Sequence, residues 1–285
     1  MKKYAGQAIC VLCLALAVAV IGKGKIMLNR AGQYTEQVTL LLQEPVDEKT
    51  VEIMRELEGT QGEPVSFTAW REEKDQRIQA EETGNDTWAN LLYISGSSEL
   101  LLPYGKILSP EDSAGCLVDA ETASELFGSP RVEGMVILAE GEKRVIRGVF
   151  SAPKRMIILQ GSGKGQEGFR RMALQRISGQ PIKALGEKFF MRHGLNGSLL
   201  RWDLSGGFSW VQELVPGKWS DFSGWKNNLQ EKSKELELIA RTEKSTLELE
   251  YLRLQKKGVI CLIIGGILVW GEVFVLLGKI YQKKY

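Results

Sequence analysis

The sequence predicts an α+β protein in which two apolar helices flank a folded domain. Three observations carry this prediction. Residues 4–22 and 258–278 are strongly apolar, the chain between them is polar in balance, and that middle part repeats a pattern of strand, helix and strand. The formal net charge is only +2 and the basic residues are scattered, so the composition gives no case for nucleic-acid binding.

The first apolar segment, residues 4–22, follows Met1-Lys2-Lys3 and approaches the length of a membrane span. A signal peptide is the alternative, because Ala15-Leu16-Ala17 offers a nominal cleavage site. The apolar run continues past that site, so we expect an uncleaved transmembrane helix. Small residues recur along it at helical spacing and would let another helix approach closely: Gly6, Cys10, Cys13 and Ala17.

The first strand–helix–strand unit follows this segment. Strands are predicted over residues 35–42 and 65–70. Asp47 can cap the helix between them and Gly59 can end it. Three apolar residues share one face of this helix: Val51, Met54 and Leu57. Residues 72–87 are highly charged and are predicted to form a surface connection.

The central block, residues 107–150, predicts a strand, a short helix and a hairpin. Cys116-Leu117-Val118 suits a buried strand, Asp119 can cap the helix that follows, and Gly128 can end it in the left-handed conformation. A turn at residues 140–142 then joins two strands. The expected core side of the helix consists of Ala123, Leu126 and Phe127.

A second strand–helix–strand unit comes after the block, with strands over residues 170–177 and 198–204. Its helix is predicted to begin at Pro181 and to end at Gly194. The buried face is expected to consist of Ile182, Leu185 and Phe189. Two such units around a block predict one discontinuous subdomain, residues 34–75 and 168–205, and one inserted subdomain, residues 76–165.

The C-terminal part is predicted as an aromatic loop (206–223), a long stalk helix (224–257) and a second transmembrane helix (258–278). Lysines lie beyond both ends of the last segment, so charge alone does not fix its orientation. One face of this helix carries Cys261, Gly265 and Glu272. Glu272 either reaches the membrane surface or contacts another helix. The apolar seam of the stalk consists of Leu229, Leu236, Ala240, Leu247 and Leu254.

An ordered set of residues in the central part resembles the MacB-like periplasmic core domain of ABC transporter permeases of the FtsX/MacB type. The resemblance is densest over residues 93–150 and looser from about 35 to 205. It rests on Gly105, Asp112, Ala123, Leu126-Phe127-Gly128, Gly134 and Gly148-Val149-Phe150.

The resemblance implies a cell-membrane protein with both termini in the cytoplasm and residues 28–257 outside it. The discontinuous and inserted subdomains would then be the Porter and Sabre subdomains of that family. The expected partners are a cytoplasmic ABC ATPase and membrane lipid, with a second permease subunit as an open option. In this family the stalk carries ATPase-driven motion to the outer domain, and the substrate does not cross through the spans.

The sequence predicts no catalytic, cofactor-binding or metal-binding residues. His193 is the sole histidine, so a histidine metal cluster is excluded. The glycine-rich residues 161–165 fail the phosphate-loop pattern, because Gly165 follows Lys164 where Ser or Thr is required. The ATPase is therefore expected on a partner chain. Family permeases carry three further spans after the core domain, so the alternative is a two-span adaptor or sensor that binds a ligand or protein outside.

Overall fold

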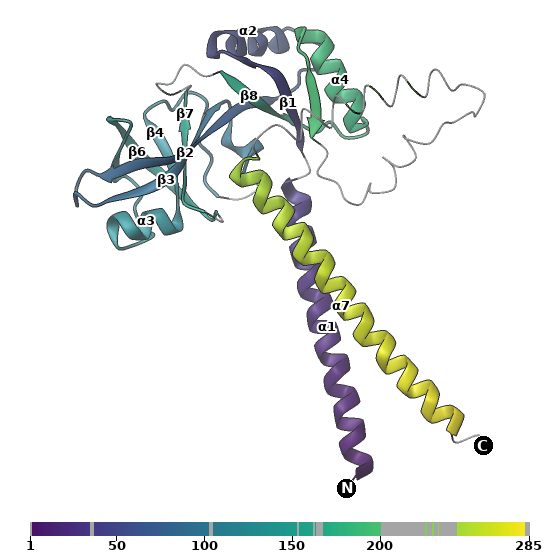
Figure 1. Cartoon of the computed structure of the whole chain (residues 1–285). Helices are drawn as coiled ribbons and strands as arrows, with labels where there is room; N and C mark the ends of the chain where they lie inside the picture. The colour runs from purple at the N-terminus through teal and green to yellow at the C-terminus, as the bar shows by residue number, and fades with distance from the viewer. Residues whose placement is uncertain are drawn as a thin grey trace. The chain divides into compact units, whose positions relative to one another are not determined.

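The computed structural model describes residues 2–34, 37–102, 105–152, 154–161, 163, 168–200 and 244–282, together with Lys226, Gln230 and Ser233. The chain forms two compact units: a helical unit (residues 1–33 and 248–285) and a domain unit (residues 34–247) (Figure 1). The predicted aromatic loop (206–223) lies outside the described residues.

One part of the domain unit is a four-stranded antiparallel sheet with the order β2-β8-β1-β9. Strands β1 and β2 run parallel with β8 between them, and β8 and β9 run parallel with β1 between them. A helix joins the two strands of each parallel pair, so this sheet consists of two interlocked split βαβ motifs. The elements are β1 (Gln37–Val46), α2 (Glu48–Gly59), β2 (Phe67–Ala80), β8 (Phe169–Gln175), α4 (Ile182–His193) and β9 (Gly197–Leu200).

Helices α2 and α4 pack on one face of this sheet (Figure 1), and the caps at Asp47 and Gly194 follow the sequence prediction, whereas α2 ends with Thr60 rather than Gly59 as its C-cap. Asp47 accepts a hydrogen bond from the Thr50 N–H at 3.0 Å, and Gly194 ends α4 with φ 62°. The buried face of α2 was predicted wrongly at one position. Leu57 is 46% exposed, whereas the neighbouring Glu58 is buried and forms hydrogen bonds with Arg192 and His193 on α4.

The insert between β2 and β8 forms a closed sheet. Its described strands follow the order β3-β7-β4-β6-β5-β2, and β2 also pairs with β3, which completes the ring. The predicted hairpin is confirmed as β5 and β6, whereas the strand β7 was not predicted. The elements are β3 (Asp86–Ser95), the 3-10 helix η1 (Ser98–Leu100), β4 (Gly115–Asp119), α3 (Ala120–Phe127), β5 (Val136–Ala139), β6 (Glu142–Phe150) and β7 (Met156–Gln160).

The prediction of a surface connection over residues 72–87 is wrong. Strand β2 continues to Ala80, and the chain turns only at residues 81–85 before β3. The outward-facing charged residues find partners across the strands, as in the 2.7 Å pair of Arg77 with Asp86, while Ile78 points into the core. The predicted subdomain boundary at residues 75/76 therefore falls inside β2.

The helical unit consists of α1 (Lys2–Tyr34) and the greater part of α7 (Thr246–Gln282), which pack antiparallel. Their approach depends on small residues: a Cβ added to Gly24 would lie 3.0 Å from the Gly258 carbonyl oxygen. Within the described residues, one helical stretch, Thr246–Phe274, is long and apolar enough to cross a membrane, with a mean hydropathy of 1.9.

Candidate functional site

The start of α7 is built into the domain unit. Helices leave their first N–H groups without partners inside the helix, and here a distant carboxylate supplies one. Glu72 on β2 accepts a hydrogen bond from the Thr246 N–H at 2.7 Å through Oε2 and another from the Thr246 hydroxyl through Oε1. The negative charge also lies at the positive end of the helix dipole.

Asn90 on β3 completes this junction. Its Nδ2 donates to Glu72 Oε1 and to Thr246 Oγ1, both at 2.9 Å, and its Oδ1 accepts from the Asp75 N–H at 3.1 Å. Asn90 is 7% exposed and Thr246 is 2% exposed, so the bonds are shielded from water. We call Glu72, Asn90 and Thr246 the α7 junction.

An apolar contact accompanies these polar ones. Leu247 is 8% exposed and belongs to the second core cluster of the domain unit, which lies on the sheet face opposite α2 and α4. Trp70 and Ala173 contribute to this cluster from β2 and β8. The first residues of α7 are thus held by both hydrogen bonds and core packing.

The neighbouring positions of β2 carry buried charge. Arg71 lies over the Tyr93 ring at 4.8 Å and pairs with Glu73 at 2.6 Å. Burial raises the pKa of Glu73. The charge of Arg71 lowers it in part, and the nearby Glu140 raises it again. Burial, together with Glu140, also raises the pKa of Tyr93 well above its usual range.

The prediction of one continuous stalk helix over residues 224–257 is wrong. Lys244 and Ser245 are not helical, and α7 begins at Thr246. The break is stabilised by the Glu72 carboxylate, which accepts from the first turn. Of the predicted seam, Leu247 lies in the domain core and Leu254 is half-buried in the helical unit. Leu229, Leu236 and Ala240 lie outside the described residues.

The predicted small residues of the two apolar segments lie as follows. Gly265 packs against Ile21, and the Cys261 side chain lies beside Gly24. Ala17 is buried, and Cys13 is half-buried. One carboxylate oxygen of Glu272 is buried without a hydrogen-bond partner among the described residues. Gly6 and Cys10 lie on α1, and their surroundings fall outside the described part.

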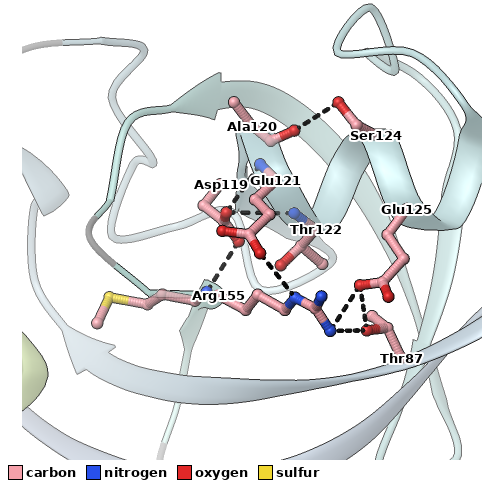
Figure 2. A network of polar contacts seen from close by, with 9 residues as sticks. Thr87, Asp119, Ala120, Glu121, Thr122, Ser124, Glu125 and Arg155 are labelled. Atoms are coloured by element: carbon pink, nitrogen blue, oxygen red, sulfur yellow. Dashed lines mark hydrogen bonds and ion pairs between the residues drawn. The ribbon is translucent and has the colours of Figure 1, made fainter.

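The predicted core-domain motif centres on the start of α3, where Figure 2 shows the polar network. Asp119 is 1% exposed; its Oδ1 accepts from the N–H groups of Glu121 and Thr122, and its Oδ2 accepts from the Met156 N–H at 2.8 Å. Arg155 pairs with Glu125 at 2.7 Å and with Glu121 at 3.3 Å. These contacts fix α3 against β7 and β3.

The other motif residues serve packing and turns. Ala123 and Leu126 are fully buried, whereas Phe127 is only partly buried. Gly128 ends α3 with φ 73°, and Gly134 has φ 86°. The Lys106 side chain lies against Gly148 and leaves no room for a Cβ atom there. Cys116 is completely buried, and burial raises its thiol pKa to about 12.

Sequence reasoning missed Glu72 and Asn90. A polar Asn within the apolar run of β3 was the available signal, since buried amides require partners. The start of α7 also had a sequence signal: Ser245-Thr246-Leu247-Glu248 matches the capping-box pattern.

Within the described residues, no group of three or more His, Cys, Asp or Glu side chains is arranged to hold a metal ion.

The fold is therefore a mixed α+β domain of two interlocked split βαβ motifs with an inserted closed sheet, in a chain that also carries a long apolar helix. It is similar to the extracellular domain of the noncanonic ABC-type transporter YknZ from Gram-positive bacteria (14% identity, TM-score 0.44, 58% of this chain and 100% of that one). It is also similar to the periplasmic region of MacB from Actinobacillus actinomycetemcomitans (12% identity, TM-score 0.48, 64% of this chain and 95% of that one). No family model and no curated protein sequence matches the chain.

Proposed function

We propose that this chain is a membrane-anchored, permease-type subunit of an ABC transporter whose outer domain receives ATPase-driven motion through α7. The resemblance of the ordered motif residues supports the class of protein. The α7 junction carries the mechanical part of the proposal, because the helix that contains the apolar span begins with two residues belonging to the domain unit.

A helix that serves only as a tether does not need its first turn in the core of a domain. Here the first turn is held by Glu72 and Asn90, on two adjacent strands, and by Leu247 in the apolar core. Moving this turn relative to β2 and β3 would leave Glu72 and Asn90 with unpaired polar atoms in a shielded place, which is costly. A displacement of α7 is therefore passed to the two strands rather than absorbed by a flexible joint.

The proposed membrane arrangement has spans at residues 4–22 and 258–278, both termini in the cytoplasm and the domain unit outside. The two interlocked split βαβ motifs would form the Porter-like subdomain, and the closed sheet inserted between β2 and β8 the Sabre-like one. The partners would be a cytoplasmic ABC ATPase, lipid and a second permease subunit. The close approach at Gly24 and Gly265 supports a role of α1 and α7 as one packed pair of spans.

The test is affinity purification of the full chain from its native membrane. We expect an ABC ATPase subunit to copurify. Hydrogen exchange of that complex should then change at residues 246–250 and in β2 and β3 when the ATPase is trapped with ATP and vanadate. Glu72→Gln should reduce the nucleotide-dependent change, whereas Glu121→Gln, a matched loss of one carboxylate outside the junction, should preserve it.

Two outcomes would contradict this proposal. If no ATPase copurifies, the transporter assignment fails and the adaptor or sensor alternative takes its place. If an ATPase copurifies but exchange at the α7 junction does not respond to nucleotide, the chain is an associated subunit that does not transmit motion.

A further inference from the structure

A second feature of the domain unit is an open cleft of about 340 Å³ between the bulge of β2, the start of β3 and the residue pair before β7. The residues that matter for its chemistry are Asp75, Trp88, Asn90, Lys154 and Arg155. The cleft is lined by the domain unit alone, so what it binds does not depend on the transporter assignment.

The bulge shapes one wall of the cleft. The β2–β3 register shifts between Glu73 and Gln76, and Asp75 has φ 51°, an uncommon conformation for a residue other than glycine. The Asp75 N–H is held by Asn90 Oδ1, so the bulge is fixed and not loose. Bulges commonly redirect side chains at functional sites, and this one directs Lys74 and Asp75 to the cleft.

Trp88 is the second unusual feature. Its side chain is 59% exposed although it lies on a strand whose next residues are almost all buried. An indole is the largest apolar side chain, and leaving it in water forgoes the stabilisation that its burial would give. An exposed indole beside a polar cleft offers a flat apolar surface for a ligand that is polar at its edges.

The charges of the cleft differ in how far they are neutralised. The Arg155 guanidinium is turned toward Glu121, Glu125 and Thr87, as Figure 2 shows, so its charge is already balanced. Lys154 is exposed and has no ion pair among the described residues. Lys74, the other lysine of the cleft, already has an interaction partner. Among the described residues, the cleft therefore offers Lys154 as an unneutralised cation beside one exposed aromatic face.

These features exclude several ligands. The Asn90 N–H already donates to the Arg155 carbonyl, and β3 pairs with β2 on one side and, from Asn90 onward, with β7 on the other. Only residues 86–89 of β3 lack a strand neighbour on that side, which is a short edge for an added peptide strand. A nucleotide would bring at least two phosphate charges to a single free cation. A wholly apolar ligand would not match walls made mainly of charged and polar groups.

We infer that the cleft binds a carboxylate-bearing sugar, with the C–H face of the ring stacked on Trp88 and the carboxylate near Lys154. A pyranose ring is apolar on one face and polar at its rim, and a single carboxylate matches the single free ammonium. Asp75 supplies an acceptor for a sugar hydroxyl at the opposite wall.

The experiment compares N-acetylmuramic acid with N-acetylglucosamine, which differ only in the lactyl ether that carries the carboxylate. Binding to the full chain in lipid nanodiscs is measured by saturation-transfer NMR and calorimetry. We expect both sugars to bind, the acid about two- to fivefold more tightly, as one solvent-exposed charge pair allows. Trp88→Ala should weaken both by about tenfold, and Lys154→Gln should remove only the preference.

The controls are Met191→Ala, which truncates an even more exposed apolar side chain on α4, and Lys49→Gln, which removes an exposed lysine on α2. Neither should alter binding. The inference is overturned if neither sugar binds, if Trp88→Ala binds as well as the unmodified chain, or if the preference survives in Lys154→Gln. Lactate competing as strongly as the sugar acid would likewise overturn it, because the cleft would then be a simple anion site.

Discussion

Helices α3 and α7 both begin at a carboxylate, but the two carboxylates come from very different places in the chain. Asp119 immediately precedes α3 and bonds to N–H groups two and three residues later. Glu72 bonds to the first N–H of α7 from 174 residues away. A local cap defines where one helix starts, whereas a remote cap also decides which strand that helix is joined to.

The two caps also differ in their surroundings. Asp119 is almost completely buried and uses both oxygens, one for the cap and one for the Met156 N–H on β7. Glu72 is only half-buried, and Asn90 shares the Thr246 hydroxyl with it. We therefore expect Asp119 to contribute more to the stability of the domain, and Glu72 to contribute more to the connection with α7.

The largest effect is expected for Asp119→Ala. The substitution removes a helix cap, about 0.5–2 kcal/mol, and leaves the Met156 N–H buried without an acceptor, about 1–3 kcal/mol. Denaturant unfolding of the domain should therefore show a loss of roughly 2–5 kcal/mol. Asp119→Asn keeps one acceptor, so its stability should lie between that of the unmodified chain and that of Asp119→Ala. A loss below about 1 kcal/mol for Asp119→Ala would show that α3 is held mainly by its apolar face.

A smaller loss, about 1–3 kcal/mol at neutral pH, is expected for Glu58→Gln. Burial alone would raise the pKa of Glu58, but hydrogen bonds from the Val65 N–H, Arg192 and His193 outweigh it and lower the pKa below the ordinary 4.5. A lowered folded pKa means that this stability is present above pH 4.5 and is lost as the pH falls through the folded value.

Unfolding measured from pH 7 down to pH 3 checks this prediction. The unmodified chain should lose its advantage over Glu58→Gln on acidification. The same margin at both ends of the range would mean that Glu58 acts through its shape and not through its charge.

Glu72→Ala should cost about 1–2 kcal/mol, since the helix start loses its acceptor at a half-buried site. The loss should be local: hydrogen exchange should become faster at residues 246–249 and remain unchanged at residues 121–127 in α3. Asp119→Ala should give the reverse pattern. If Glu72→Ala instead loosened α3, or left the start of α7 unaffected, the α7 junction would not be the cap that its geometry indicates.

The same contrast explains what the sequence could predict. The caps at Asp119 and Gly128 and the hairpin at residues 140–142 depend on residues within one or two turns of each other, and all three were predicted correctly. The partnership of Glu72 with Thr246 depends on how the sheet brings distant segments together, which no local pattern encodes. The charged half of β2 was mistaken for a loop because its exposed positions hold charges that pair across strands.

The smallest effect, and one of opposite sign, is expected at Glu73, next to Glu72 on β2. Burial, aided by Glu140, raises the pKa of Glu73 above 4.5, and Arg71 opposes the shift only in part. A raised folded pKa means that the protonated form is favoured in the folded state, so stability from this group is lost as the pH rises through the folded value. Glu73→Gln removes that loss but also removes the 2.6 Å pair with Arg71, so the net change at neutral pH should be about 0.5 kcal/mol or less.

The discriminating measurement for Glu73 is the slope of stability against pH rather than its value at one pH. Relative to the unmodified chain, Glu73→Gln should become more stable as the pH rises above 4.5. Glu58→Gln should become less stable as the pH rises toward 4.5 and should show a constant difference above it. Parallel slopes for the two variants would mean that the paired charge of Arg71 dominates the burial of Glu73. In that case the ionised Glu73 would stabilise the sheet at neutral pH through its pair with Arg71, and its burial beside the α7 junction would carry no net cost.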